Sequence, residues 1–149
     1  RMASQYGLDM LIVDYLQLVD AGVRTDIREQ EIAYISRSLK KLARELSVPV
    51  LAVSQLSRAV ERRESKRPLL SDLRESGALE QDADVVMFIF REDYYNRPSE
   101  QGHASGQGAG SEAEVIIAKQ RHGPPGTVTI VFNKAYASFY PLAAEEAPF

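Results

Sequence analysis

The sequence predicts an α/β fold in which helices flank a parallel central sheet and antiparallel strands extend the sheet at its C-terminal end. Two apolar runs, at residues 11–13 and 50–53, lack the polar alternation of half-exposed strands and are typical of strands buried inside a parallel sheet. An amphipathic stretch separates them, as in a right-handed βαβ unit. After residue 113, three β-prone stretches follow one another, and a Gly- and Pro-rich turn joins the first two.

The composition is that of one globular domain. The chain has 149 residues, of which 44% are hydrophobic and 26% are charged. Because cysteine is absent, disulfides and thiolate metal sites are excluded. No apolar run reaches the roughly 18 residues of a membrane span, and the first residues lack a signal-peptide apolar region. These features favour a cytoplasmic protein without membrane contact. With a net charge of −3, any nucleic-acid binding has to come from local basic patches.

The domain is expected to cover residues 1–142. Within it, residues 97–111 are rich in Gly, Ser, Gln and Pro, which predicts a flexible insert. Residues 143–149 are small and acidic, which predicts a disordered tail. His103 lies in the insert and His122 in a turn, and neither has metal-ligand partners nearby in the sequence. A histidine metal site is therefore not expected.

The first apolar run ends on an acidic residue. Asp14 directly follows the run Leu11–Val13, so it lies at the carboxyl end of the predicted strand. Open α/β sheets bind their ligands at this end. A carboxylate here can serve a magnesium site, but many α/β strands end in Asp simply to turn the chain. The strand by itself leaves both interpretations open.

An amphipathic helix is predicted between the two strands. Asp26 and Glu29 have the spacing of a capping box, so the helix is expected to begin near Ile27. Pro49 pushes Val48 out of the helical region and ends the helix. One apolar stripe faces the core and consists of Ile32, Ile35, Leu39, Leu42 and Leu46.

The second strand, Val50–Val53, also ends in polar residues. A right-handed crossover makes the two strands parallel. Asp14 and the pair Ser54 and Gln55 are therefore expected to open onto the same crevice.

Residues 56–70 are locally basic in an otherwise acidic chain. Such a run is usually a solvated face, but it binds phosphates if it lines a pore or groove. The sequence leaves both possibilities open. Its charged residues are Arg58, Glu61, Arg62, Arg63, Glu64, Lys66 and Arg67.

The C-terminal half is predicted to be mainly β structure. A loop or short helix at residues 71–84 precedes a third apolar strand, Val85–Phe90. Lys119 and Arg121 follow the next strand two residues apart, so on an extended segment their side chains project to the same side. This predicts a pair of cations at a strand end. The three C-terminal β-prone stretches are residues 114–118, 127–133 and 138–142.

Four ordered motifs carry a resemblance to a known family. The segments LIVDYLQL, ISRSLKKLARELSVPVLAVSQLSR, DLRESGALEQDADVVMFIFR and AKQRHGPPGTV resemble the C-terminal motor domain of DnaB-type hexameric replicative helicases, a branch of the RecA-like ATPases. The resemblance runs from about Gly7 to Tyr140. It implies a partial RecA-like P-loop NTPase core, ATP and Mg²⁺ as cofactors, and ATP-driven translocation on DNA with duplex unwinding.

The resemblance implies a role for each of four nucleotide-site residues. Asp14 matches the Walker B aspartate, which holds magnesium, usually through water. Gln55 matches the glutamine that senses the γ-phosphate and links it to the DNA loops. Lys119 and Arg121 match the cations that reach the nucleotide of the neighbouring subunit.

The resemblance also implies a DNA-binding surface and binding partners. Arg74, Glu75 and Gly77 match a loop that touches the single-strand backbone. Arg62, Arg63 and Lys66 lie in a segment that resembles a second pore loop. The implied partners are single-stranded DNA, further copies of the chain in a homohexamer, primase and a helicase loader.

The phosphate-binding P-loop is not found in this sequence. The P-loop motif requires a Gly-Lys dipeptide, and the chain contains none. The resemblance places the motif and its strand upstream of Arg1. The chain alone is therefore expected neither to hydrolyse ATP nor to unwind DNA. A strand is also expected to be missing between Val50–Val53 and the strand that begins at Val85, so the open edges should close up, swap with another copy or aggregate.

Two alternative functions remain open at this point. The chain could belong to another RecA-like ATPase of recombination or repair, although DLRESG and KQRHGP argue against this. It could also be a non-catalytic module for DNA binding or oligomerisation.

Overall fold

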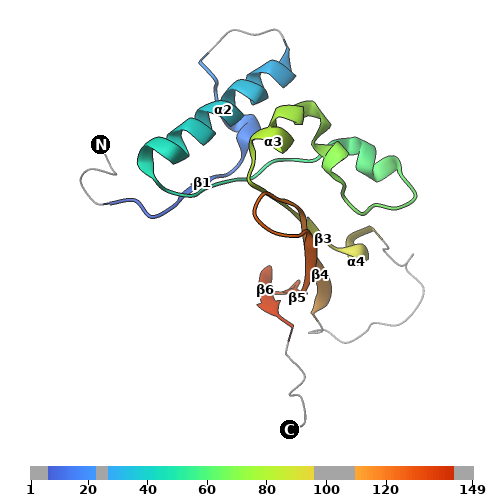
Figure 1. Cartoon of the computed structure of the whole chain (residues 1–149). Coiled ribbons are helices and arrows are strands. Elements are labelled where there is room, and N and C mark those ends of the chain that lie inside the picture. Colours follow the sequence, from blue (N-terminus) through green and yellow to red (C-terminus); the bar gives the residue numbers. More distant parts are fainter. Residues whose placement is uncertain (1–6, 23–26, 96–109, 143–149) are drawn as a thin grey trace. The chain divides into compact units, whose positions relative to one another are not determined.

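The computed structural model describes residues 7–22, 27–95 and 110–142 (Figure 1). The chain divides into two compact units. The first comprises residues 1–63 and 69–84, and the second comprises residues 64–68 and 85–149. The predicted capping residue Asp26, most of the predicted insert and the C-terminal tail lie outside the described residues.

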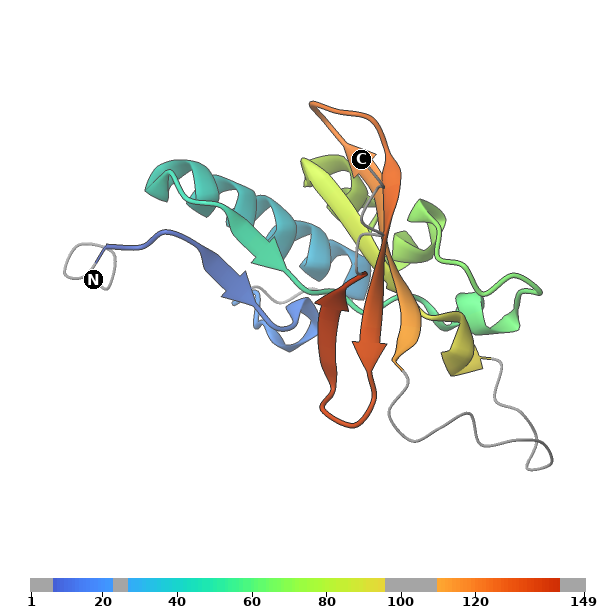
Figure 2. The same cartoon turned by 90° about the horizontal axis from the view of Figure 1, so that it is seen from below.

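The first unit is built on a parallel βαβ element, as predicted. Strands β1 (Leu11–Val13) and β2 (Val50–Ala52) pair in parallel, with Leu11 opposite Val50. Helix α2 (Arg28–Leu46) connects them and runs beside both strands (Figure 2). The carboxyl ends of β1 and β2 therefore lie at the same edge of the sheet.

Helix α2 has the predicted limits to within two residues. Its N-cap is Ile27, which makes no side-chain capping hydrogen bond, and Glu29 lies in the first turn, where the helix dipole favours a negative charge. The helix ends at Ser47, which has left-handed backbone angles (φ 53°). The predicted stripe faces the core at Ile32 and Ile35, which are buried with Leu16, whereas Leu46 at the end of the stripe is exposed.

The prediction that both apolar strands are covered on both faces is wrong. The side chain of Ile12 is 61% exposed and that of Leu51 is 41% exposed. Helix α2 and the short 3₁₀ helix η1 (Leu16–Leu18) pack on one side of this element. Within the described residues of this unit, no helix covers the other face, which explains the exposure.

The remainder of the first unit consists of short helices, as predicted for residues 71–84. The 3₁₀ helices η2 (Arg58–Arg62) and η3 (Leu70–Ser76) precede helix α3 (Gly77–Asp82). Helix α3 packs against α2, and the buried hydroxyl of Ser36 donates a hydrogen bond of 2.7 Å to the carboxylate of Asp82. An ion pair between Lys40 and Asp84 closes the same contact.

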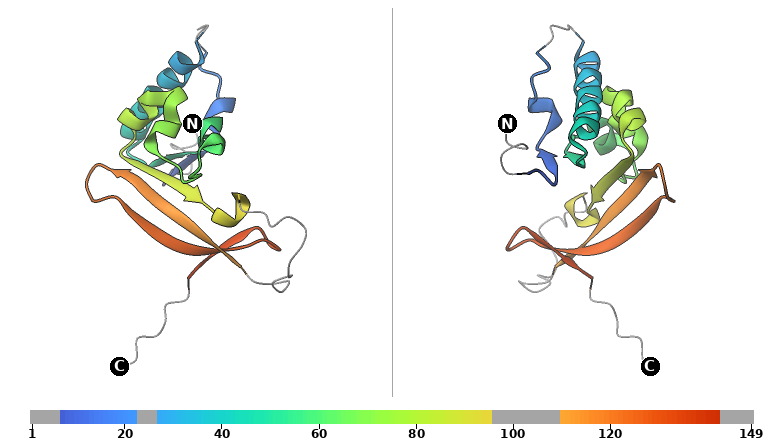
Figure 3. Two further views of the ribbon diagram at one scale, coloured as in Figure 1. Left: turned by 90° about the vertical axis from the view of Figure 1, so that its right-hand side faces the viewer. Right: turned by 60° about the vertical axis from the view of Figure 1, so that its left-hand side comes forward.

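The second unit is an antiparallel sheet with the order β3-β4-β5-β6, twisted as Figure 3 shows. The three C-terminal strands appear where they were predicted. Strand β4 begins at Ser111, which the prediction had assigned to the insert, because residues 111–117 pair along β5. The strands are β3 (Val85–Phe90), β4 (Ser111–Gln120), β5 (Gly126–Asn133) and β6 (Ser138–Pro141).

Strand β3 buries one face only. Val86 and Phe88 point into the core, whereas Val85, Met87 and Ile89 on the opposite face are 44 to 62% exposed. Strand β3 pairs with β4 and lies in a different sheet from β2. The expected consequences of a strand missing between β2 and β3 stay a prediction.

A cluster of charges and rings ties helix α4 (Glu92–Tyr95) to the sheet. Arg91 donates two hydrogen bonds to the carboxylate of Asp93, at 3.2 and 3.0 Å, and its guanidinium lies 4.0 Å from the ring centroid of Phe132. Lys134 approaches the same carboxylate to 2.6 Å. Hydrogen bonding from Arg91, followed by that from Lys134, lowers the pKa of Asp93 from its usual value near 3.8 to about 2 against the opposing effect of burial.

We expect Asp93→Asn to lower the free energy of unfolding at neutral pH and to remove the part of it that disappears in acid. A lowered carboxyl pKa stabilises the fold above pH about 4, and this contribution is lost as the pH falls towards 2. After allowance for partial exposure, the loss at pH 7 is about 1 to 2 kcal/mol. Thermal unfolding of the 149-residue chain between pH 7 and pH 2 measures the effect.

Glu112→Gln is the matched control for this prediction, because Glu112 is exposed on the same sheet. Asp93→Asn should flatten the loss of stability between pH 4 and pH 2, and the control should not. Identical acid profiles for the two variants would contradict the assignment.

Candidate functional site

The structure brings Asp14 and Gln55 to the same edge of the parallel sheet. Asp14 is exposed directly after β1, and Gln55 is exposed three residues after β2 ends. The two strand ends are held together by backbone hydrogen bonds of 2.9 Å, from Val53 to Val13 and from Leu16 to Val53. Both side chains are therefore available to one ligand at the edge where α/β sheets bind nucleotides.

Gln17 is a third polar residue at this edge, and the sequence interpretation missed it. Its side-chain amide donates to the hydroxyl of Ser54 at 3.2 Å and makes contacts of 3.5 Å with the backbone of Gln55 in both directions. Gln17 thus holds the segment that carries Gln55. The signal in the sequence was a single polar residue inside the apolar run LQLV.

Asp14 fits the role of a magnesium ligand. Mg²⁺ prefers oxygen ligands and commonly uses one or two carboxylates together with phosphate oxygens and water. Within the described residues, no group of three or more His, Cys, Asp or Glu side chains could hold a metal by itself. An ion at this edge would therefore share Asp14 with nucleotide phosphates and water.

Two arginines of the basic stretch form ion pairs, one in each unit of the chain. Arg62 is exposed at the end of η2, whereas Arg63 forms an ion pair in the first unit. Arg67, in the second unit, makes contacts of 2.7 and 2.8 Å with the two carboxylate oxygens of Glu114 and lies 5.7 Å from the ring centroid of Phe90. Two cations that could have been solvated or bound to phosphate are thus engaged with acidic side chains.

The Arg67–Glu114 pair also changes the titration of both groups. A side-chain hydrogen bond from Arg67 lowers the pKa of Glu114, and the same bond raises the pKa of Arg67. The pair fixes residues 64–68 to the antiparallel sheet, and Lys66 lies half-buried in the same segment.

The three residues of the predicted DNA loop lie in short helices, just after a kink in the backbone, and not in an extended loop. Arg74 and Glu75 are in η3, and Gly77 is the first residue of α3. The backbone leaves helical angles at Leu73, where ψ is 17°. Gly77 is exposed, and a Cβ atom added there would meet no atom within 4 Å.

Lys119 and Arg121 lie at a strand end, as predicted. Lys119 is half-buried in β4 opposite Val86, and Arg121 is exposed in the turn that follows. They belong to the second unit, whereas Asp14 and Gln55 belong to the first.

Comparison with known proteins identifies the family. Residues 1–141 match the family model described as DnaB-like helicase C terminal domain. The chain belongs to this family. It is 53% identical over 143 residues to the replicative DNA helicase DnaB of Geobacillus stearothermophilus, a match that covers 95% of this chain and 30% of the relative. It is 54% identical over 139 residues to the replicative DNA helicase DnaB of Haemophilus influenzae, which covers 93% of this chain and 28% of that relative.

Solved structures agree with this membership. A structure described as that of a DnaB-like replicative helicase and its interactions with primase matches with a TM-score of 0.77 and 53% identity over 89% of this chain. A second solved structure, described as an ATPase domain, matches with a TM-score of 0.78 and 53% identity. The match covers 30% of the first of these chains and 44% of the second, and the described part of this chain is thus a partial RecA-like domain. None of the helices in residues 7–22, 27–95 and 110–142 is long and apolar enough to cross a membrane.

Proposed function

We propose that this chain is part of the motor of a hexameric replicative DNA helicase, which couples ATP hydrolysis to translocation on single-stranded DNA and to duplex unwinding. The observation that carries the proposal is the placement of Asp14 and Gln55 at one edge of a parallel sheet, in a chain of the DnaB family. We further propose a cytoplasmic location and partnership with primase and a helicase loader.

Asp14 and Gln55 form one half of the nucleotide site in this proposal. Phosphoryl transfer depends on positioning and on charge stabilisation more than on covalent chemistry. Asp14 would hold a magnesium ion, which would supply charge neutralisation on the phosphates. Gln55 senses the γ-phosphate from the end of β2, and Gln17 supports it there.

Lys119 and Arg121 form the other half of the site, on the neighbouring subunit. A cation supplied across a subunit boundary stabilises the charge of the transition state and contributes on the order of 10³ to 10⁵ in rate. Arg121 is exposed in a turn, as such a role requires, and Lys119 lies two residues before it.

The DNA-contacting residues in this proposal are Arg74, Glu75 and Gly77, with Arg62 and Lys66 as further candidates. Contacts to a single-strand backbone bind without sequence preference and depend strongly on salt. The exposure of Gly77 is compatible with such contacts.

The chain alone should neither hydrolyse ATP nor unwind DNA, because it contains no Gly-Lys dipeptide of a P-loop. A full-length helicase in which this segment replaces the matching part of the Geobacillus stearothermophilus protein should do both. Steady-state ATPase and fork-unwinding assays on the two proteins test this. ATPase activity of the purified chain, or a folded hexameric chimera without activity, would contradict the proposal.

In this chimera, Arg74→Ala should weaken binding to single-stranded DNA and reduce the slope of log affinity against log salt by roughly 0.7 per lost phosphate contact. Binding titrations at several salt concentrations measure both quantities. Arg37→Gln is the control, because Arg37 is exposed on α2 and the variant loses the same charge. An unchanged affinity and slope in Arg74→Ala would remove the DNA-loop assignment.

The trans role of Arg121 predicts complementation between two inactive variants. Asp14→Asn subunits keep Arg121, and Arg121→Ala subunits keep Asp14, so a mixed hexamer contains some intact sites. ATPase activity in the absence of DNA should therefore appear when the two variants are mixed. A subunit that carries both substitutions is the control and should restore neither variant. Mixed hexamers that form without regaining activity would refute the trans assignment.

A further inference from the structure

Asp72 is an acidic residue buried inside the first unit. Only 5% of its surface is exposed, and an unpaired buried carboxylate is strongly destabilising. It lies in η3, two residues before Arg74. Its negative charge therefore needs hydrogen-bond donors inside the fold. These donors fix the position of η3, which also contains Arg74.

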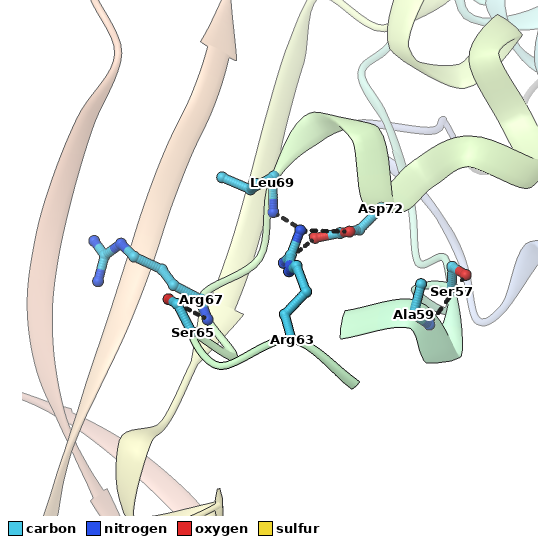
Figure 4. A network of polar contacts seen from close by, with 7 residues as sticks. All are labelled: Ser57, Ala59, Arg63, Ser65, Arg67, Leu69 and Asp72. Carbon is cyan, nitrogen blue, oxygen red and sulfur yellow. Dashed lines mark hydrogen bonds and ion pairs between the residues drawn. The ribbon is translucent and has the colours of Figure 1, made fainter. Parts of the chain in front are cut away.

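The side chain of Asp72 is bound on two sides. Arg63 donates two hydrogen bonds to its carboxylate oxygens, at 3.0 and 2.8 Å, and the backbone N–H of Leu69 donates a third at 2.7 Å. Figure 4 shows the guanidinium facing the carboxylate from the end of η2. The paired donor fork is a geometry that Arg provides and Lys does not.

The backbone of Asp72 has a further partner. Its carbonyl accepts a 3.0 Å hydrogen bond from the backbone N–H of Ser57. Ser57 follows Gln55 by two residues, and Arg74 follows Asp72 by two residues. A single residue therefore connects the chain leaving β2 with the chain entering the proposed DNA loop.

We propose that Arg63 and Asp72 form a positioning pair that fixes the DNA-contacting segment to the end of the nucleotide-sensing strand. Arg63 acts on DNA through Asp72 and does not contact the phosphates itself. The hydrogen bond from Ser57 to Asp72 attaches this pair to the chain that leaves β2. This inference rests on the proposed function, since it assigns a position to the loop that is proposed to bind DNA.

A positioning role and a purely electrostatic role of Asp72 predict opposite effects of Asp72→Asn on the affinity for DNA. If only charge mattered, Asp72→Asn would tighten DNA binding, because it removes a negative charge near the phosphates. If Asp72 positions the loop, the same substitution loosens it and weakens the response to DNA. Asparagine has nearly the same volume as aspartate, so packing is preserved.

The experiment uses the full-length helicase that carries this segment, with the variants Arg63→Gln, Asp72→Asn, their combination and Arg63→Lys. Arg37→Gln is the control for the loss of one positive charge. The measured quantities are the concentration of oligo(dT) that half-maximally stimulates ATPase activity, and the salt slope of DNA binding. Hexamer assembly and unfolding temperature identify variants that fail to fold.

Arg63→Gln and Asp72→Asn should each raise the half-stimulating oligo(dT) concentration by about tenfold. Their combination should be no worse than the poorer of the two, because both disrupt one interaction. The salt slope of Arg63→Gln should equal that of the unsubstituted protein. Arg63→Lys should recover part of the loss compared with Arg63→Gln, since it keeps the positive charge but lacks the paired donor fork. Deuterium exchange over residues 69–77 should rise in Asp72→Asn, while exchange in α2 stays constant.

Tighter DNA binding by Asp72→Asn, or a salt slope reduced by roughly 0.7 in Arg63→Gln, would overturn the proposal in favour of direct contact. Additive losses in the double variant would also overturn it. The variant Arg74→Ala shows whether the positioning pair alone is wrong or the proposed DNA-contacting segment is wrong as well. If Arg74→Ala has no effect on DNA binding, the DNA-loop assignment fails; if it acts while the Arg63 and Asp72 variants do not, only the positioning pair fails.

Discussion

The burial of one carboxylate organises the part of this chain that joins β2 to the segment proposed to bind DNA. Asp72 is almost fully buried, so its charge is tolerated only with close donors. Arg63 and the Leu69 amide supply them, and Ser57 binds the carbonyl of the same residue. The chain around residues 57, 63 and 69–72 is thereby held at one point, and the short helices η2 and η3 gain a fixed relation that they would lack alone.

The residues proposed to bind the nucleotide are divided between the two units of the chain. Asp14 and Gln55 lie at the end of the βαβ element, where parallel pairing places any polar residue that follows β1 or β2. Lys119 and Arg121 lie at a strand end of the antiparallel sheet. In a ring of identical subunits, one copy can supply the first pair and its neighbour the second. In such a ring, ATP hydrolysis would depend on the contact between neighbouring subunits. This dependence is expected of a motor whose subunits move relative to one another.

The sequence predicted the features that depend on local periodicity and chain direction. The limits of α2, the parallel strand pair and the shared edge of Asp14 and Gln55 all follow from apolar spacing and from Pro49. The exposure of Ile12 was not predictable, because it depends on what covers the second face of the sheet. The partners of the basic stretch were also hidden, since Arg67 meets Glu114 across 47 positions of the chain and spacing carries no information about such a pair.

If Arg63 stays with Asp72 when DNA is bound, it acts as a positioning residue; if it leaves, it contacts DNA directly. A structure of the hexameric helicase carrying this segment, with oligo(dT) and a non-hydrolysable ATP analogue, measures this directly. In subunits that hold DNA, the guanidinium of Arg63 should remain within hydrogen-bond distance of the Asp72 carboxylate, with Arg74 at the phosphate backbone. If the guanidinium of Arg63 instead leaves Asp72 and binds a DNA phosphate, Arg63 and Asp72 are not a positioning pair.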